Sequence, residues 1–515
     1  MLNKKSSTPI IEWTLYSLFF FLLCLNLIPH LNLWGDEAAS FHLASLSMKN
    51  ILANVDVHSP NYYFFLKWIL TLTGSAYSDE ATIRLVHATI FLGGLYFGYQ
   101  ILSMILERDW VKVSFCFVLL LPTTIFYATN IRMYALLYCF SMWFIYAILQ
   151  YLGQGEPVSL KKNGNILISG ILLLAVDYVG FLYYALGVLF ILLRTPKWNQ
   201  AKLWLFILFP FLVFLIEGLF FLTPIIVPSL QAFFIWPFTS SPIVHEHSMI
   251  FVLKWIFSAS RPFLELSDIS SPHLYFILAY LFFLGILLVV GTLCLIKKFL
   301  AEKDWRLLFL LAIAYFWTIL FFSGTSITRI FLPSQLCMVA LIFYGLSHLP
   351  IQKKWQWMMA CGLLVVPFFM ALFPAPRLLS QIPYQQIATD ILNDARQAKI
   401  DTILISGYSE NYKAITHYLS QNPHLPIVIK KLDVDFGQKD LPTKRFLFLS
   451  YMGENNRFVD AARFSDEFHK KVSVMHTYLK LTDLPFNAIW KKNILSRSHQ
   501  EYAYVIYQVW PTKHA

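Results

Sequence analysis

Two adjacent carboxylates, Asp36 and Glu37, follow directly after the first long apolar segment of the chain, in the stretch Trp34-Gly35-Asp36-Glu37. Ionisable groups at membrane depth are costly and usually mark a site rather than a scaffold. One carboxylate of such a pair can act as a general base toward a hydroxyl or an amine, and the other can orient that acceptor or hold a metal ion. A helix cap or a solvated loop pair is the alternative.

The composition is that of a membrane protein. The chain has 515 residues, of which 57% are hydrophobic, 17% aromatic and only 13% charged. A soluble domain carries about 25% charged residues. The net charge of +11 could suggest nucleic acid, but most lysines and arginines before residue 355 fall in short gaps between apolar runs, as topology signals do. We therefore predict no nucleic-acid partner.

Apolar runs long enough to span a bilayer recur along the chain. The sequence predicts about eleven spans, an odd number, with the first read as an uncleaved helix. The predicted ranges are 11–31, 82–106, 110–127, 131–150, 164–177, 180–193, 203–222, 274–296, 307–322, 329–347 and 356–373. The fold class is thus mostly α, a polytopic membrane helix bundle, over residues 1–373.

The charges of alternate loops predict the orientation. One set of loops holds closely spaced basic residues, namely Lys4, Lys5, Arg108, Lys112, Lys161, Lys162, Arg194, Lys197, Lys202, Lys297, Lys298, Lys303, Arg306, Lys353 and Lys354. In the opposite set the basic residues are spread over much longer segments. The positive-inside rule puts the dense set in the cytoplasm. We expect a multi-pass protein of the inner (cytoplasmic) membrane with a cytoplasmic N-terminus.

It follows that Asp36, Arg132, Asp177, Arg261 and Arg329 share the outer face. Residues 39–53 carry apolar residues at helical spacing and predict an amphipathic helix on the membrane surface. The apolar segment 60–73 is too short to span and is interpreted as re-entrant or interfacial. Residues 250–257 predict another interfacial helix in the long outer loop 223–273.

The composition changes after residue 373, and residues 374–515 predict a small extracytoplasmic α/β domain. Strands are expected at 402–406, 427–432, 445–450, 472–479 and 503–509, with helices at 384–398, 411–420 and 457–470. This region has no GxGxxG, no P-loop and no serine elbow. We interpret it as a module for binding or for positioning an acceptor rather than as a second enzyme.

Three further motifs could join the carboxylate pair. His58-Ser59-Pro60-Asn61-Tyr62-Tyr63 closes the same outer loop, Arg132-Met133-Tyr134 opens the fourth span, and Arg329 opens the tenth. The planar fork of arginine suits a phosphate, which makes Arg132 and Arg329 candidate ligands for an anionic group. Each motif also has a structural interpretation, because a lone histidine often only hydrogen-bonds and interfacial Arg/Tyr pairs often only anchor a helix.

The remaining candidates are more isolated. Asp177 lies at the outer turn between the fifth and sixth spans, and Glu217 lies inside the seventh span, where it must be paired or neutral. Either could support the site or simply pair with an arginine. His245 and His247 face the same side only if their segment is extended, and they could then bind a divalent ion together with Glu37 and His58.

Taken in order, these motifs resemble those of the GT-C glycosyltransferases. The motifs are an Asp-Glu pair after the first helix, then His-x-Pro-x-Tyr-Tyr, then Arg-Met-Tyr-Ala-Leu, and late in the membrane part Arg-x-Phe-Leu-Pro. The resemblance is to the branch of protein O-mannosyltransferases and aminoarabinose transferases, and in architecture it covers residues 10–373. His-Ser-Pro stands here where many members have His-Pro-Pro.

The resemblance implies an enzyme that moves a sugar from a polyprenyl-phosphate donor to an acceptor at the outer membrane face, with inversion. It places Asp36 at the position of the catalytic carboxylate with Glu37 beside it, and Arg132 and Arg329 near the lipid phosphate. A divalent metal is a possible cofactor. The acceptor is left open between protein, a glycolipid and a lipid A-like molecule.

A transporter or flippase for lipid-linked sugars is the main rival, since it would also need outward carboxylates and phosphate-binding arginines. Against it, the unusual charges gather on one face, whereas many transporters have a midplane site and internal repeats. A scaffold that only displays the C-terminal domain fits the membrane-face charges less well.

Overall fold

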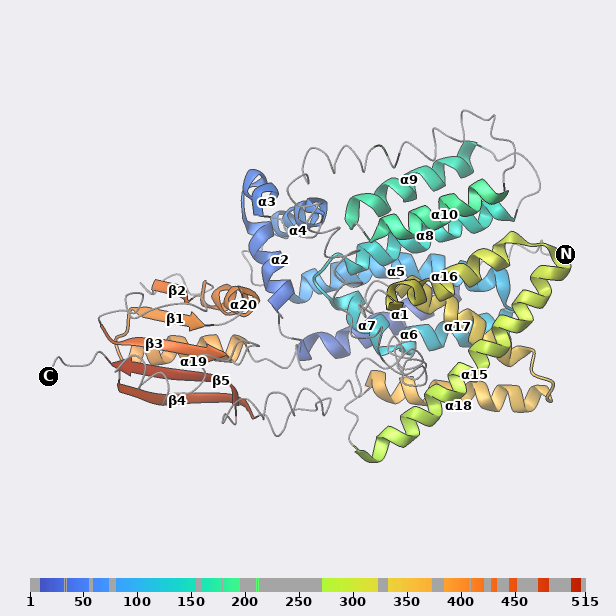
Figure 1. The fold of residues 1–515 in the computed structure, drawn as a ribbon. Coiled ribbons are helices and arrows are strands. Elements are labelled where there is room, and N and C mark those ends of the chain that lie inside the picture. The colour runs from blue at the N-terminus through green and yellow to red at the C-terminus, as the bar shows by residue number, and fades with distance from the viewer. Residues whose placement is uncertain are drawn as a thin grey trace.

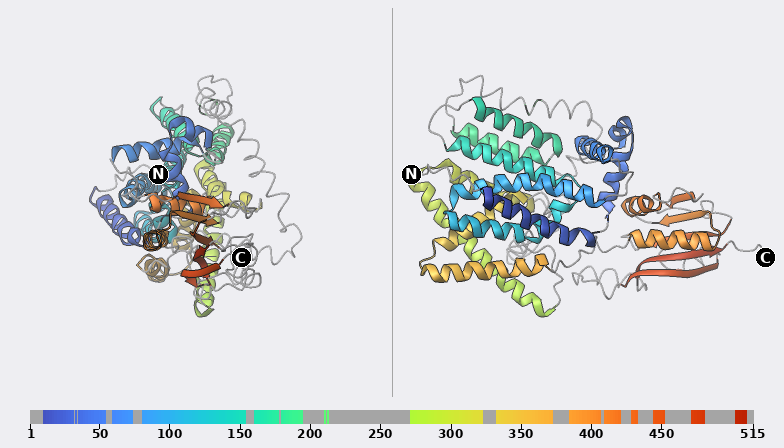
Figure 2. Two further views of the ribbon diagram at one scale, coloured as in Figure 1. Left: turned by 90° about the vertical axis from the view of Figure 1, so that its left-hand side faces the viewer. Right: turned by 180° about the vertical axis from the view of Figure 1, so that it is seen from behind.

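The structure, a computed structural model, combines a helix bundle with a sheet-containing domain at one end of it (Figure 1). The ranges that it describes are 10–31, 33, 35–54, 59–73, 80–153, 160–177, 179–194, 210, 212, 271–322, 332–372, 384–406, 409–420, 428–432, 444–451, 471–480 and 502–510. Between bundle and sheet lie the short helices α2, α3 and α4 (Figures 1 and 2).

The bundle helices coincide with the predicted apolar ranges. They are α1 (Ile10–Leu27), α5 (Glu80–Ile105), α6 (Arg108–Leu120), α7 (Pro122–Thr129), α8 (Tyr134–Leu152), α9 (Leu160–Val176), α10 (Gly180–Arg194), α15 (Ser271–Glu302), α16 (Trp305–Phe322), α17 (Leu332–Ser347) and α18 (Lys353–Leu372). The predicted span 203–222 lies outside the described residues apart from Pro210 and Leu212. The mostly α membrane bundle is confirmed.

The number of spans is not settled by these helices. Among the described residues four helices are long and apolar enough to cross a bilayer, or five if the bent pair α6 and α7 forms one span. The pair bends by 58° at Leu121, whose extended backbone is what a following proline favours. Helices α9, α10 and α17 have 17, 15 and 16 residues, fewer than the roughly 20 needed for a straight crossing. Eleven spans therefore stays a prediction.

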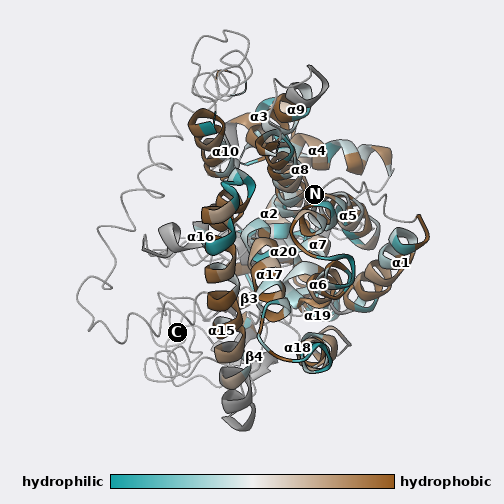
Figure 3. Cartoon of the chain, turned by 90° about the vertical axis from the view of Figure 1, so that its right-hand side faces the viewer, coloured by the Kyte–Doolittle hydropathy of each residue, from teal (hydrophilic) through white to brown (hydrophobic). Residues whose placement is uncertain are grey.

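The outer surface of the bundle is apolar. On α15, the side chains of Phe282, Val289 and Leu293 are 67%, 56% and 61% exposed, and much of this helix is coloured as hydrophobic in Figure 3. In water such a long apolar face would be strongly unfavourable, whereas lipid tails solvate it well. The multi-pass membrane assignment thus follows from the surface as well as from composition.

Two glycines let α15 and α17 approach closely. A Cβ atom at Gly291 would lie 1.9 Å from the carbonyl oxygen of Leu341, and one at Gly345 would lie 2.4 Å from the carbonyl oxygen of Leu287. Small residues at such crossings let helix backbones touch, which is how membrane helices gain packing energy.

Basic residues of the set predicted to be cytoplasmic lie at one end of the bundle. At the end remote from the sheet, Glu12 near the start of α1 lies 2.9 Å from Arg108 and 3.0 Å from Lys112 at the start of α6. Both basic residues belong to the set predicted to be cytoplasmic. The opposite end carries α2, α4 and the C-terminal domain, as the alternation of loops predicts. Which end faces the cytoplasm stays a prediction.

The predicted interfacial helix 39–53 is two helices, α2 (Gly35–Ser45) and α3 (Met48–Asn54), followed by α4 (Pro60–Leu72). Asp36 and Glu37 both lie in the first turn of α2, so the helix begins before the predicted start at residue 39. Acidic residues there favour the helix through its dipole. At the other end of α2, the ammonium of Lys67 donates to the carbonyl oxygens of Ala44 and Leu46 at 3.3 and 2.8 Å.

The C-terminal domain contains a five-stranded sheet in the order β2-β1-β3-β5-β4. Its strands are β1 (Thr402–Ser406), β2 (Val428–Leu432), β3 (Phe446–Tyr451), β4 (Lys471–Lys480) and β5 (Tyr502–Trp510), with helices α19 (Tyr384–Gln397) and α20 (Ser409–Ser420). Strands β1, β2 and β3 are parallel, and β5 is antiparallel to β3 and β4. The five predicted strands are confirmed, while the predicted helix 457–470 lies outside the described part.

A test of the α15–α17 packing compares two glycines of α15. We expect Gly291→Val to lower the free energy of unfolding by about 1–3 kcal/mol or more, because the new side chain meets backbone atoms that cannot move aside. The measurement is thermal unfolding of the purified protein in detergent. Gly285→Val is the matched control, since a Cβ there meets no described atom within 4 Å. Equal unfolding temperatures for the two variants would contradict this packing.

Candidate functional site

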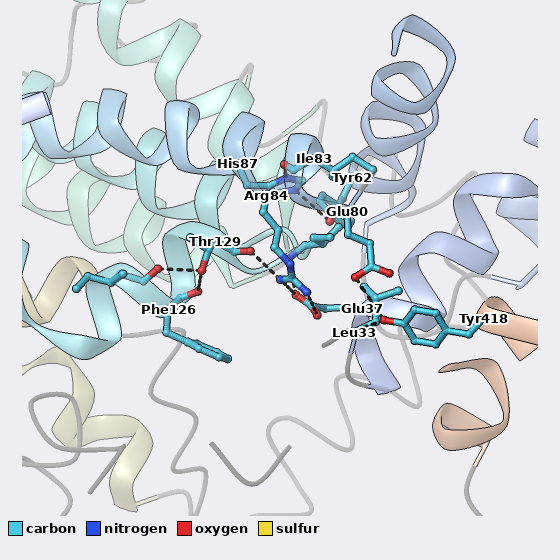
Figure 4. Close-up of polar contacts among 12 residues, drawn as sticks. Leu33, Glu37, Tyr62, Glu80, Ile83, Arg84, His87, Phe126, Thr129 and Tyr418 are labelled. Carbon is cyan, nitrogen blue, oxygen red and sulfur yellow. Dashed lines mark hydrogen bonds and ion pairs between the residues drawn. The ribbon is translucent and has the colours of Figure 1, made fainter. Parts of the chain in front are cut away.

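Glu37 forms a buried ion pair with Arg84 of α5 (Figure 4). The Arg84 Nη1 and Nη2 atoms donate to Glu37 Oε1 and Oε2 at 2.8 and 2.9 Å. Both side chains are almost fully buried, with 1% and 2% of their surfaces exposed. This two-pronged geometry is the strongest arrangement available to an arginine and a carboxylate.

The same pair also binds the break between α7 and α8. The backbone N–H of Ile131 donates to Glu37 Oε1 at 2.8 Å, and Arg84 Nη1 donates to the carbonyl oxygen of Thr129 at 2.9 Å. Thr129 ends α7, and Ile131 begins the turn before α8. Backbone groups that a helix end leaves unpaired are thus satisfied by the ion pair. One interaction thereby joins α2, α5 and the α7–α8 break.

The ion pair changes how Glu37 can act. From sequence alone its role was open between orienting an acceptor and holding a metal. Because both of its oxygens accept hydrogen bonds from Arg84 and one accepts a second from Ile131, the geometry favours a positioning role. A buried carboxylate with such partners is fixed in place.

Arg132 lies on the same side of α2 as this pair. Its Nη1 atom donates to the hydroxyl of Ser40 at 3.0 Å, and its side chain is 4% exposed. Ser40 stands one helical turn after Asp36 on α2, so positions 36 and 40 share a face of the helix. The side chain of Asp36 itself lies outside the described part of the chain. The backbone nevertheless brings two predicted site residues, Asp36 and Arg132, to one helix face.

Tyr62 of α4 lies in the same cluster. Its hydroxyl is 3.3 Å from Nε2 of His87, whose Nδ1 donates to the carbonyl oxygen of Ile83 at 2.8 Å, so Nε2 accepts from the tyrosine (Figure 4). Burial raises the pKa of Tyr62 well above its usual range, and the nearby Arg132 guanidinium offsets part of that rise. Tyr62 is therefore a neutral donor.

Two more predicted tyrosines adjoin this cluster. Glu37, Tyr63 and Tyr134 lie near the Tyr62 hydroxyl, and the Tyr62 and Tyr63 rings meet edge to face with centroids 5.4 Å apart. Residues Glu37, Tyr62, Tyr63, Arg132 and Tyr134 thus gather at one place. We call these five, together with Asp36, Arg84 and His87, the outer site.

Asp177 lies at the turn between α9 and α10, next to the start of α4. Its Oδ1 atom accepts from the N–H of Val179 at 2.9 Å. The hydroxyl of Ser59 and the amide of Asn61 donate to the carbonyl oxygen of Ala175 at 2.6 and 3.0 Å. Asp177 therefore faces the end of the bundle that carries α4, and its side chain holds its own turn.

The other predicted site residues cannot be placed. Arg329, His58, Glu217, Arg261, His245 and His247 lie outside the described residues. Of the four predicted metal ligands this leaves Glu37, whose oxygens bind Arg84 and Ile131. No group of three or more His, Cys, Asp or Glu side chains suited to a metal occurs among the described residues. A divalent metal remains a prediction that rests on the undescribed histidines.

Sequence reasoning missed Arg84, His87 and Ser40. The signal for Arg84 was present, because an arginine within a predicted apolar span must find an anionic partner or a route to water. Because Glu37 lies at the end of the first predicted span, the sequence would have allowed an ion pair between Glu37 and Arg84 to be predicted. Ser40 carried no comparable signal, since a serine on an amphipathic helix is ordinary.

No family model and no curated protein matches the sequence. Among solved structures, ArnT of Cupriavidus metallidurans bound to undecaprenyl phosphate is similar with a TM-score of 0.52, 11% identity and 98% coverage of both chains. Its apo form has a TM-score of 0.45, 12% identity and coverage of 97% of this chain and 98% of that one.

An oligosaccharyltransferase of Archaeoglobus fulgidus, in complex with Zn and sulfate, has a TM-score of 0.47 and 10% identity. That match covers 78% of this chain and 61% of the longer archaeal protein. Only the ArnT structure with undecaprenyl phosphate, among these three, has a TM-score above 0.5, and at 11% identity the similarity shows a shared fold and nothing more. The chain has the GT-C fold that its motifs predicted.

A test of the ion pair removes one partner and then both charges. We expect Arg84→Met to destabilise the protein by about 3–5 kcal/mol, because Glu37 is left buried without its counter-ion. Glu37→Gln combined with Arg84→Met removes both charges but keeps an acceptor for the Ile131 N–H, and should recover part of the loss. Thermal unfolding in detergent measures both effects.

Arg108→Met is the control, because this arginine is 62% exposed in its pair with Glu12, and exposed pairs contribute little. If the double variant is less stable than Arg84→Met alone, the buried, unpaired charge of Glu37 is not the cause of the instability of Arg84→Met.

Proposed function

We propose that this chain is a membrane glycosyltransferase that moves a sugar from a polyprenyl-phosphate donor to an acceptor at the outer face of the cytoplasmic membrane. The observation that carries the proposal is the buried Glu37–Arg84 pair, which fixes the first turn of α2, and with it Asp36, at one end of a GT-C bundle. The similar ArnT structure contains undecaprenyl phosphate, a lipid of the proposed donor class.

In the proposed reaction, Asp36 is the general base. As the acceptor hydroxyl or amine attacks the anomeric carbon, Asp36 takes its proton and the bond from that carbon to the phosphate oxygen breaks. Attack from the side opposite the leaving group inverts the anomeric configuration. The products are the glycosylated acceptor and the free polyprenyl phosphate, which keeps the electron pair of the broken bond.

Arg132 and Arg329 are proposed to bind the donor phosphate. Charge grows on the leaving phosphate in the transition state, and a fixed guanidinium in a water-poor site stabilises that charge strongly. Arg132 is already held against α2 through Ser40. Arg329 precedes α17, which begins at Leu332.

The tyrosines and the flanking polar residues are proposed to shape the substrate site. Tyr63 and Tyr134 offer hydroxyl donors beside Arg132, and the Tyr62 hydroxyl, whose proton is donated to His87, offers an acceptor. His58 precedes α4, on which Tyr62 and Tyr63 stand. Asp177, Glu217 and Arg261 remain candidates for supporting roles. A metal held by His58, His245 and His247 would add positive charge at the outer face, and no step above depends on it.

The charge alternation of the loops supports the proposed orientation, with the N-terminus in the cytoplasm and residues 374–515 outside. There the acceptor would be a protein, a glycolipid or a lipid A-like molecule. Domains 1–373, the catalytic membrane part, and 374–515, the extracytoplasmic part, are proposed to work as one enzyme.

The direct test uses Asp36→Asn. Purified protein is incubated with labelled polyprenyl-phosphate sugars and membrane extract, and label in the acceptor is followed. We expect transfer to fall by about 10²–10⁴-fold, the usual contribution of a general base. Near-normal transfer by Asp36→Asn would remove Asp36 as the base. Movement of labelled lipid across vesicles without any labelled product would instead favour the transporter.

A second test addresses the phosphate ligands. We expect Arg329→Ala to raise the KM for the donor by tenfold or more while the KM for the acceptor changes little, because a lost charge-assisted hydrogen bond is worth about 1.5–3 kcal/mol. Steady-state kinetics with each substrate varied in turn gives both constants. Arg108→Ala, at the opposite end of the bundle, is the control. An unchanged donor KM would remove the assignment of Arg329.

A further inference from the structure

The C-terminal domain contacts residues that flank the outer site through two adjacent side chains of α20, Tyr418 and His417. The backbone N–H of Leu33 donates to the Tyr418 hydroxyl at 3.2 Å, and that hydroxyl donates to Glu80 Oε2 at 3.4 Å (Figure 4). His417 Nε2 lies 3.6 Å from Glu80 Oε1. The His417 ring also packs against Phe41 of α2, with centroids 5.2 Å apart.

These contacts fall at both ends of the segment that carries the proposed base. Leu33 stands just before α2, and Glu80 is the first residue of α5. Glu80 is one helical turn before Arg84, which holds Glu37. A single tyrosine hydroxyl therefore bridges the chain entering α2 and the helix that anchors it.

The surroundings of Tyr418 favour the neutral form of its side chain. Tyr418 is 6% exposed, and burial, reinforced by the negative charge of Glu80, raises its pKa well above the usual range. A protonated phenol can donate to Glu80 and accept from Leu33 at the same time, so both groups are satisfied. Loss of the hydroxyl would leave the buried Leu33 N–H without an acceptor, which is costly.

We infer that Tyr418 is a positioning residue for catalysis, supplied by the C-terminal domain, which holds the start of α2 and thereby Asp36 in its working place. This inference rests on the proposed function for its catalytic part. It gives the C-terminal domain a role in the reaction itself, in addition to any binding of the acceptor.

The first arm of the test needs no substrate. Hydrogen–deuterium exchange of the full chain in detergent is followed in peptides covering residues 31–41. We expect Tyr418→Phe, which keeps the ring, to speed exchange at Leu33 and in the first turn of α2 by about tenfold. Tyr412→Phe, which removes a hydroxyl earlier on α20, is the matched control and should leave this exchange unchanged. Unchanged exchange in Tyr418→Phe overturns the positioning role.

The second arm measures transfer. We expect Tyr418→Phe to lower kcat by about tenfold with the donor KM unchanged, and to cause no further loss in an Asp36→Asn background, because the group it positions is then absent. A purely structural tyrosine would lower activity in both backgrounds. Glu80→Gln, which keeps an acceptor for Tyr418, should lose less activity than Glu80→Ala.

The two arms separate the possible failures. If the wild-type chain transfers no sugar, the proposed function falls, while the exchange arm still decides whether Tyr418 holds α2. If exchange quickens but kcat stays at the wild-type value, Tyr418 positions α2 without a catalytic consequence, and the link to Asp36 is overturned.

Discussion

The ion pair between Glu37 and Arg84 is the interaction on which the rest of the outer site depends. It removes two charges from water, which is unfavourable unless every donor and acceptor is satisfied. Here both carboxylate oxygens and two backbone groups at the α7–α8 break take part. The Glu37–Arg84 pair contacts three elements that are distant in sequence, namely α2, α5 and the α7–α8 break. These contacts therefore fix the position of α2 against the bundle.

The ion pair explains how the adjacent residues Asp36 and Glu37 can have different roles. On a helix, neighbouring residues point about 100° apart, so Glu37 can turn into the junction while position 36 shares a face with Ser40. The residue that anchors cannot also move protons freely, since its oxygens are occupied. In the proposed mechanism the second carboxylate of the Asp-Glu pair is therefore a support for the first.

Hydropathy and strand alternation predicted the elements well, and the contacts among them poorly. The bundle helices and the five strands lie where the apolar runs place them, because burial in lipid or in a sheet demands those patterns. The bend between α6 and α7 was indicated in the sequence only by Pro122, and the helix that α2 begins was predicted to start only at residue 39. Arg84 was hidden inside a predicted span, since hydropathy averages over single charges and takes no account of which partner neutralises them.

The coupling of the C-terminal domain lay furthest from what sequence could indicate. Tyr418 and Leu33 are separated by 385 positions, and neither residue type suggests a partner. Composition predicted a domain that binds or positions an acceptor, yet its α20 lies against α2, the helix that carries the proposed base. A domain so placed can affect the proposed reaction by holding the helix that carries the proposed base, because the Leu33 and Glu80 contacts lie before and after that helix in the chain. Loss of the domain would then remove activity even if the membrane part still bound its donor.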